Sequence, residues 1–284
     1  MIVDDGSTDD TPLIVERYAK RYPHIKFIKF DCNKGTNAAR NAAISLAKGR
    51  FSIILDSDDY FVEDAMLTVH TAISENGNYK HYMFAPDDMC PKYENNYLLR
   101  GRDTRTLSFA DFLSGCISGD FVHVIETETL KKYPFDESLR IYEGTFFLRF
   151  YKEAGRMLFT NKTVTIRERS RADSVTREGF RTSKAVIKKE IKSINLWVQW
   201  FSDDCLRLGL VDALSVKRSS LLLNYLMLSD YSNAREQIYL IKKLNKEIPL
   251  HITLIYRLRC GWMLRLAGKL YLNVKYNLLK KDLK

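Results

Sequence analysis

The stretch that most constrains the fold is an apolar run that stops at a group of acids, Phe51-Ser-Ile-Ile-Leu-Asp-Ser-Asp-Asp59. Such a run, with Gly49 before it and carboxylates after it, is typical of a buried parallel strand. In open α/β sheets, ligands lie outside the carboxyl ends of the strands, where these acids fall. Neighbouring carboxylates repel one another unless something positive neutralises them. A divalent cation held by one or two carboxylates and substrate phosphates is one interpretation. An acidic turn that caps the next helix is the other.

The first half of the chain alternates short apolar segments with helical patterns. Strands are predicted at 2–3, 25–30 and 51–55, each followed by a helix. This spacing indicates right-handed crossovers and a parallel sheet. The predicted fold class is α/β, with a Rossmann-like, mostly parallel sheet flanked by helices.

After about residue 180 the apolar residues recur with the period of a helix and continue to do so. We therefore expect two domains, residues 1–180 with the sheet and residues 181–284 as a helical region.

The distribution of cysteines, apolar runs and charges argues against several kinds of site and location. The 5 cysteines are scattered without a C-x-x-C pair, which argues against a zinc site or a disulfide framework. The chain opens without a basic and apolar leader, and no apolar run reaches the length of a spanning helix, which favours a cytoplasmic location. Of the net charge of +10, most lies in residues 250–284, so the body of the protein is near neutral.

Three motifs stand in order along the first unit: Val3-Asp-Asp-Gly-Ser-Thr-Asp9, Asn33-x-Gly-x-x-x-Ala-Arg-Asn41 and Leu55-Asp-Ser-Asp-Asp59. In this order and spacing they resemble the family 2 glycosyltransferases, over residues 1 to about 175. The resemblance implies the GT-A fold and inverting transfer of a sugar from a nucleotide diphosphate, here a UDP-sugar. It also implies Mn²⁺ or Mg²⁺ as cofactor. The implied acceptor is a cell-surface glycan or a lipid-linked acceptor on the cytoplasmic face of a bacterial membrane.

The resemblance also implies roles for individual residues. The metal would be held by Asp58 with Asp56 alongside, and the substrate would be contacted by Asp4, Asp5, Arg40, Asp56, Arg167 and Arg169. Asp5 would contact the uracil or ribose, and the two late arginines the diphosphate. Each has an ordinary alternative: a turn and cap for Asp4 and Asp5, a surface helix position for Arg40, and a solvated loop for Arg167 and Arg169.

Two departures from the family pattern stand out. The family's first strand, the Pro-x-Tyr-Asn-type turn after it and the following helix have no counterpart, so we expect the sequence to lack this N-terminal part. The family's Glu-Asp pair, whose Asp is the general base, is matched here by Glu143-Gly144. Glu143 is the predicted base, with Asp136 or Glu137 as alternatives. A structural role for Glu143 is an acid at a helix N-terminus.

The basic tail, 250–284, interleaves aromatic and aliphatic residues with Lys and Arg. This pattern suits an anionic membrane surface and predicts a peripheral protein on the inner face of the cell membrane, unless the segment is a terminal helix packed on the helical region. Two rival functions remain: a non-catalytic binding or scaffold protein on the nucleotide-sugar fold, and a nucleic-acid-binding protein. The second is disfavoured, because the charge is confined to one tail and no recognition motif is present.

Overall fold

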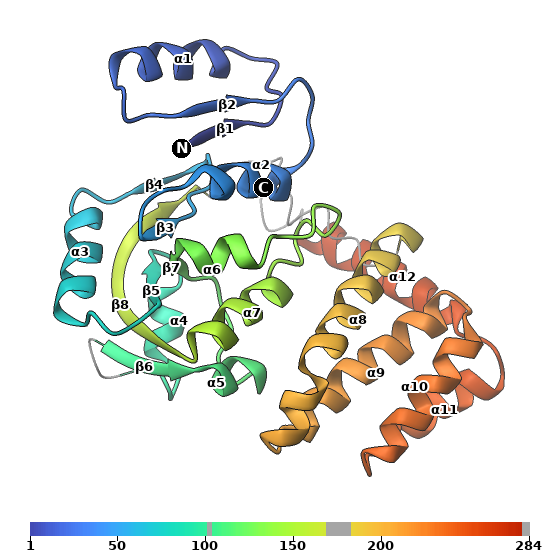
Figure 1. The fold of residues 1–284 in the computed structure, drawn as a ribbon. Helices are drawn as coiled ribbons and strands as arrows, with labels where there is room; N and C mark the ends of the chain where they lie inside the picture. Colours follow the sequence, from blue (N-terminus) through green and yellow to red (C-terminus); the bar gives the residue numbers. More distant parts are fainter. Residues whose placement is uncertain (101–103, 169–182, 280–284) are drawn as a thin grey trace. The chain divides into compact units, whose positions relative to one another are not determined.

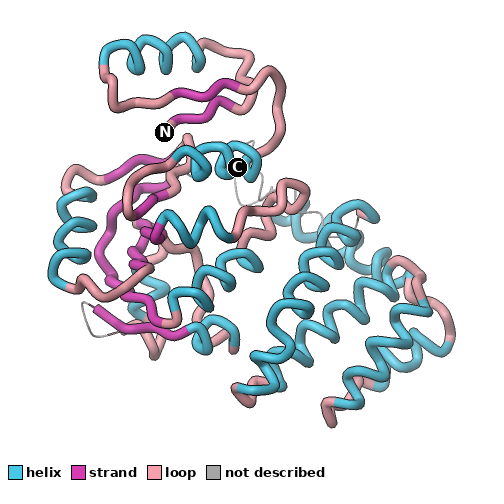
Figure 2. Tube along the Cα trace, viewed as in Figure 1, coloured by secondary structure: helices cyan, strands magenta, loops and turns pink. Residues whose placement is uncertain are grey.

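The computed structural model describes residues 1–100, 104–168 and 183–279, the last eight of these by their backbone alone. The chain divides into two units, Met1–Arg171 and Ala172–Lys284. All described strands lie in the first unit, whereas the second consists of helices joined by short turns (Figures 1 and 2). The α/β fold class followed by a helical region is therefore confirmed.

The first unit starts with a small parallel pair. Strands β1 (Ile2–Asp4) and β2 (Phe27–Lys29) pair in parallel, with helix α1 (Thr11–Arg21) connecting them, as the alternating pattern predicts. Helix α2 (Thr36–Leu46) follows and contacts both β1 and α6.

A second, six-stranded sheet forms the main body of this unit. The order of its main path is β3-β7-β5-β8-β4, and β6 pairs with β8. Its strands are β3 (Phe51–Ile53), β4 (Asp59–Phe61), β5 (His81–Pro86), β6 (Thr104–Ser108), β7 (Val122–Glu126) and β8 (Arg156–Arg167). Among the described strands of this sheet, only β5 and β8 pair in parallel.

The expectation that the strand before Asp56 joins β1 and β2 in one parallel sheet needs correction. Strand β3 instead pairs antiparallel with β7, and Phe51 lies opposite Glu126. Apolar periodicity identifies a buried strand, but it carries no information on which neighbour that strand will pair with.

Helices cover both faces of the larger sheet (Figure 1). On one face, α3 (Ala65–Glu75) packs against Tyr82 and Phe84 of β5. The other face carries short helices that the connections supply: α4 (Cys90–Glu94), α5 (Phe109–Leu113), α6 (Thr127–Lys132) and α7 (Gly144–Ala154). Every residue of β5 is buried, as expected for a central strand that is covered on both sides.

The face of β5 under α7 buries two histidines. His81 Nε2 lies 3.0 Å from His123 Nδ1 of β7, and the ring of Tyr151 stacks on His81. Burial lowers the pKa of His81 well below its usual range, with His123 adding to the shift, and burial lowers the pKa of His123 to about 3. Both imidazoles are therefore neutral at physiological pH.

The second unit consists of α8 (Lys184–Arg207), α9 (Val211–Met227), α10 (Tyr231–Lys243), α11 (Leu250–Arg257) and α12 (Trp262–Leu279). Its core includes Leu221, Leu222 and Leu226 of α9 with Ile241 of α10. None of the helices in the described part of the chain is long and apolar enough to cross a membrane.

Candidate active site

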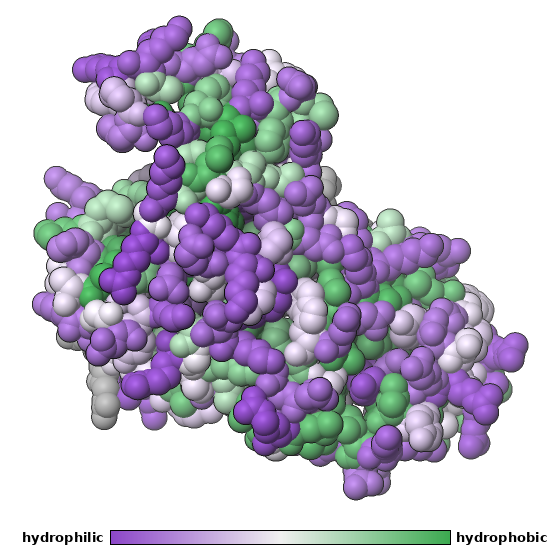
Figure 3. Space-filling model, viewed as in Figure 1, coloured by the Kyte–Doolittle hydropathy of each residue, from purple (hydrophilic) through white to green (hydrophobic). Residues whose placement is uncertain are grey.

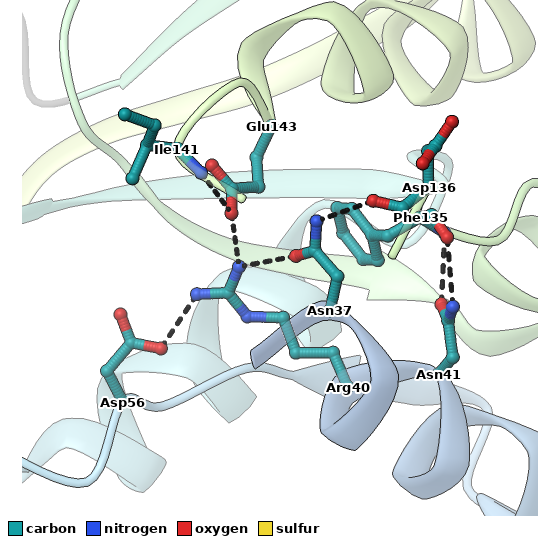
Figure 4. Close-up of polar contacts among 8 residues, drawn as sticks. All are labelled: Asn37, Arg40, Asn41, Asp56, Phe135, Asp136, Ile141 and Glu143. Atoms are coloured by element: carbon teal, nitrogen blue, oxygen red, sulfur yellow. Dashed lines mark hydrogen bonds and ion pairs between the residues drawn. The ribbon is translucent and has the colours of Figure 1, made fainter. Parts of the chain in front are cut away.

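Helix α2 is the element from which the candidate site is built. Its N-cap, Gly35, has φ +94°, which suits a residue without a side chain, and the preceding loop is held by Asp5. Residues three and four apart on a helix share a face. Asn37, Arg40 and Asn41 therefore project together from α2, and Figure 4 shows all three reaching across to other segments.

The two asparagines fix the chain between β7 and α7. Asn41 donates to the carbonyl of Phe135 at 2.9 Å and accepts from the Phe135 N–H at 2.9 Å, so its amide pairs with that residue as a strand would. Asn37 donates to the carbonyl of Asp136 at 2.9 Å. Neither role was predicted from the sequence motifs. The signal available was a pair of asparagines spaced i, i+4 in a helix of small residues.

Arg40 joins two of the predicted site residues. Its Nη2 donates to Asp56 Oδ1 at 2.8 Å, and its Nη1 lies 3.2 Å from Glu143 Oε1 (Figure 4). The side chains of Arg40 and Glu143 are each 19% exposed, whereas that of Asp56 is 55% exposed. The guanidinium of α2 thus links the acid after β3 with the acid before α7, which lie 16 and 103 positions from Arg40 in the sequence.

Glu143 lies at the N-cap of α7, where the positive end of the helix dipole favours an anion. Its Oε1 also accepts the N–H of Ile141 at 3.1 Å. Ile141 has φ +71°, an unfavourable conformation for a β-branched residue, and its side chain is exposed. A strained backbone turn and a partly buried guanidinium therefore orient the same carboxylate oxygen. The alternatives Asp136 and Glu137 do not contact Arg40 among the described hydrogen bonds.

The acids that follow β3 form a turn, in which Asp59 N–H donates to the Asp56 carbonyl at 3.1 Å. Burial raises the pKa of Asp59 above its usual value, and the charges of Asp58 and Asp56 raise it further. The carboxylates therefore repel one another electrostatically, as the sequence indicates. Within the residues described, no three His, Cys, Asp or Glu side chains are arranged as a complete metal site. A cation here would need further oxygen ligands, which is the usual situation for Mg²⁺ bound with substrate phosphates.

Asp4 and Asp5 both have partners within the protein. Asp4 is 4% exposed, and its carboxylate accepts the Ser7 N–H at 3.3 Å, which is the turn role considered from the sequence. Asp5 accepts from the N–H groups of Lys34 at 2.6 Å and Gly35 at 2.9 Å. The acid of the first motif therefore anchors the loop of the second motif, and its contact with a nucleotide stays a prediction.

Arg167 is the last residue of β8 and lies beside the acids that follow β3. It lies opposite Asp59 in the β4–β8 pair, makes a two-pronged contact with Asp88, and donates to Asp120 Oδ2 at 3.0 Å. Burial alone would lower the pKa of Arg167, but the hydrogen bonds with Asp88 and Asp120 raise it above its ordinary value. A contact with diphosphate would have to compete with these carboxylates. Arg169 lies outside the described residues.

Comparison with known proteins finds a family match for the first part of the chain. Residues 1–121 match the sequence profile of Glycosyl transferase family 2. The matched residues contain β1, α2 and the acids after β3, whereas Glu143 lies beyond the matched region.

Two curated relatives are a GalNAc(5)-diNAcBac-PP-undecaprenol β-1,3-glucosyltransferase of Campylobacter jejuni and the glycosyltransferase GlyG of Streptococcus pneumoniae. The first is 28% identical over 62% of this chain, and the chain spans 57% of its length. The second is 26% identical over 81% of this chain and 79% of its own.

The fold also has a counterpart among solved structures. Residues 1–349 of TarS from S. aureus superpose with a TM-score of 0.58 at 16% identity, over 95% of this chain and 81% of that one. The same protein has been solved in complex with UDP-GlcNAc. At this identity the likeness is one of fold.

Proposed function

We propose that the chain is an inverting glycosyltransferase that moves a sugar from a nucleotide-diphosphate donor, a UDP-sugar, to a cell-surface glycan or lipid-linked acceptor. The observation that supports this most directly is the link from Asp56 through Arg40 to Glu143. It connects the acids of a family 2 motif with the carboxylate that the sequence analysis selected as base. The relative in C. jejuni, whose name specifies an undecaprenol-linked acceptor, supports the acceptor class.

Each end of this link has a task in the proposed reaction. The acceptor hydroxyl forms a bond to the anomeric carbon of the donor sugar as the bond from that carbon to the diphosphate breaks, with inversion. The hydroxyl proton passes to Glu143, whose Oε2 has no hydrogen-bond partner among the described residues. The Ile141 N–H and Arg40 hold Oε1, which orients the carboxylate before substrate binds.

At the other end of the link, Asp56 and Asp58 are the residues that would hold Mn²⁺ or Mg²⁺ beside the diphosphate. The exposed Asp58 and the half-exposed Asp56 fit such an ion, because both present hard oxygen ligands at the end of β3. The ion would supply positive charge to the departing nucleotide. Arg167, together with Arg169, is the proposed contact for the phosphates, and Asp5 for the uracil or ribose.

The proposal is tested by measuring UDP release from UDP-glucose, UDP-galactose and UDP-GlcNAc with Mn²⁺, in the presence and absence of polyprenyl-diphosphate-linked glycans. Acceptor-stimulated UDP release from one donor is the expected result. A chain that binds UDP but never releases it from any donor, with any acceptor, would contradict catalysis and favour the binding or scaffold role. An acceptor carried on a lipid would place the reaction at a membrane surface, and we propose the inner face of the cell membrane.

A further inference from the structure

Helices α11 and α12 expose an apolar stripe that the core does not use. The basic tail is two helices, with a turn at Arg259–Gly261, rather than one. Along both helices a large apolar side chain is exposed at every fourth position, with exposed fractions between 46% and 74%. These are Leu250, Leu254, Leu258, Trp262, Leu266 and Leu270. A spacing of four places neighbouring members of each helix on one face.

The opposite sides of the same helices already pack against the core. Ile252 is buried with Leu222 and Leu226 of α9, and Ile255 and Leu264 pack against that cluster. The turn between the helices is pressed onto α9, since a Cβ at Gly261 would lie 2.2 Å from the Leu226 carbonyl oxygen. The helices are thus fixed on α9 by one apolar face, and the stripe is a second apolar face. Figure 3 shows hydrophobic side chains at the surface of this helical unit.

The charge around the stripe has one sign. Between Leu250 and Tyr271 the sequence has four basic residues, Arg257, Arg259, Arg265 and Lys269, and no Asp or Glu. Three of them, Arg257, Arg259 and Lys269, are exposed. None of the four forms an ion pair with an acidic residue in the described part of the chain. Arg259 lies 5.5 Å above the ring of Tyr231 instead.

We propose that the exposed faces of α11 and α12 dock on an anionic lipid bilayer. The Leu and Trp side chains of the stripe would enter the boundary between headgroups and acyl chains, while the arginines and lysine stay with the lipid phosphates. The alternating apolar and basic positions fit this two-layered partner. A second copy of the chain fits less well, because a symmetric contact would bring two uncompensated basic faces together. Docking on a bilayer is a property separate from the proposed transferase reaction. It is argued only from the exposed residues of α11 and α12.

The test is flotation of the full chain with vesicles of phosphatidylcholine alone and of phosphatidylcholine mixed with phosphatidylglycerol. We expect binding to the anionic vesicles, weakened by salt, and much less binding to the neutral ones. The double variant Arg257→Gln/Lys269→Gln should weaken anionic binding about 25-fold, at roughly fivefold for each charge removed. Leu258→Ser/Leu266→Ser should weaken binding to both kinds of vesicle. Because all four side chains are exposed, thermal unfolding should be unchanged.

A matched control lies on α10 of the same unit. Tyr239→Ser/Lys243→Gln removes an exposed apolar residue and a basic residue outside the stripe, and should leave vesicle binding unchanged. The proposal is overturned by equal binding to the two kinds of vesicle, by no binding to either, or by stripe variants that bind like wild type. It is also overturned if sedimentation velocity shows a dimer that the stripe variants abolish without any lipid binding. UDP titration of each variant separates these outcomes from failure of the donor site.

Discussion

Glu143 accepts both of its described hydrogen bonds on one carboxylate oxygen, which leaves Oε2 available for a proton. We predict that Glu143→Gln lowers turnover at least about 100-fold, because the amide cannot take the acceptor proton. UDP affinity should be unchanged, since Gln can still accept from the Ile141 N–H and from Arg40. Steady-state kinetics and calorimetry measure the two quantities.

Glu128→Gln is the control for this change. It removes an exposed carboxylate on α6, paired with Lys131, that contacts no residue of the candidate site. Its turnover should match wild type. If Glu143→Gln also turns over at the wild-type rate, the base lies elsewhere.

Ile141 connects backbone strain with the orientation of Glu143. Its φ of +71° costs an ordinary residue about 1 kcal/mol, which glycine avoids. Ile141→Gly should therefore leave thermal stability equal or higher and lower turnover, because the freed turn holds the Glu143 carboxylate less firmly. Donor KM should be unchanged. Asn also tolerates this conformation, so Ile141→Asn should keep more of the turnover. A glycine variant with full turnover would show that the strain has no part in the reaction.

At the residue scale the motifs predicted identities better than arrangements. Arg40, Asp56 and Glu143 were predicted as separate members of a site, and the structure links them. Asn37 and Asn41 were missed because their partners are backbone groups of Phe135 and Asp136, about a hundred positions later. Backbone groups exist at every residue and leave no signal in the sequence.

Among the elements, four helices of the second unit, α8 to α11, end in the same way. In α8 to α11 a residue with positive φ follows the helix, and the next N–H bonds back five residues to a helix carbonyl. The residues with positive φ are Gly209, Ser229, Asn245 and Arg259. This is the Schellman arrangement, which satisfies helix carbonyls and turns the chain into the next helix. Only one of the four is glycine, so a sequence search for glycine stops finds Gly209 alone.

Ser229→Gly tests this description of the helix ends. Ser229 is exposed with φ +60°, and glycine there should raise the free energy of unfolding by about 1 kcal/mol. Ser220→Gly, in the interior of α9, is the matched control. It should lower the free energy of unfolding by a similar amount, about 1 kcal/mol, since glycine is unfavourable inside a helix. Urea denaturation measures both, and equal signs for the two variants would contradict the assignment.

The strands show where prediction from sequence reached its limit. The two apolar segments at 157–159 and 164–166 are parts of one strand, β8, of 12 residues. Between them the β5–β8 register shifts, at Ala85 opposite Thr163. The polar residues at this irregularity mask the continuity of the strand. Pairing partners are set by contacts between distant segments, so the antiparallel β3–β7 pair was not predictable from local pattern.

For the whole molecule, the buried histidine pair makes stability depend on pH. The pKa values of His81 and His123 are lowered by folding, so the unfolded chain binds more protons than the folded one below about pH 6.5. Their contribution is fully present above that pH and is lost as the pH falls toward 3. Within this window, each histidine should lower the free energy of unfolding by about 1.4 kcal/mol for each unit by which the pH falls.

Urea denaturation from about pH 7.5 to about pH 4.5 covers the upper part of this window. It measures the slope of the free energy of unfolding against pH. The double variant His81→Phe/His123→Phe keeps aromatic packing and should have a shallower dependence on pH. His24→Gln changes an exposed histidine and should leave the slope as it is. Parallel slopes for wild type and the double variant would show that the pair does not take up protons on unfolding.

If the acids after β3 form a nucleotide-sugar site, nucleotide binding should depend on them and on a metal ion, which a UDP titration measures. UDP is titrated calorimetrically into the full chain with and without Mn²⁺, and again into Asp58→Ala. We expect UDP binding that requires Mn²⁺ and disappears in the variant, because Asp58 would hold the ion that meets the diphosphate. UDP binding of equal strength without metal, or undiminished in Asp58→Ala, would contradict it.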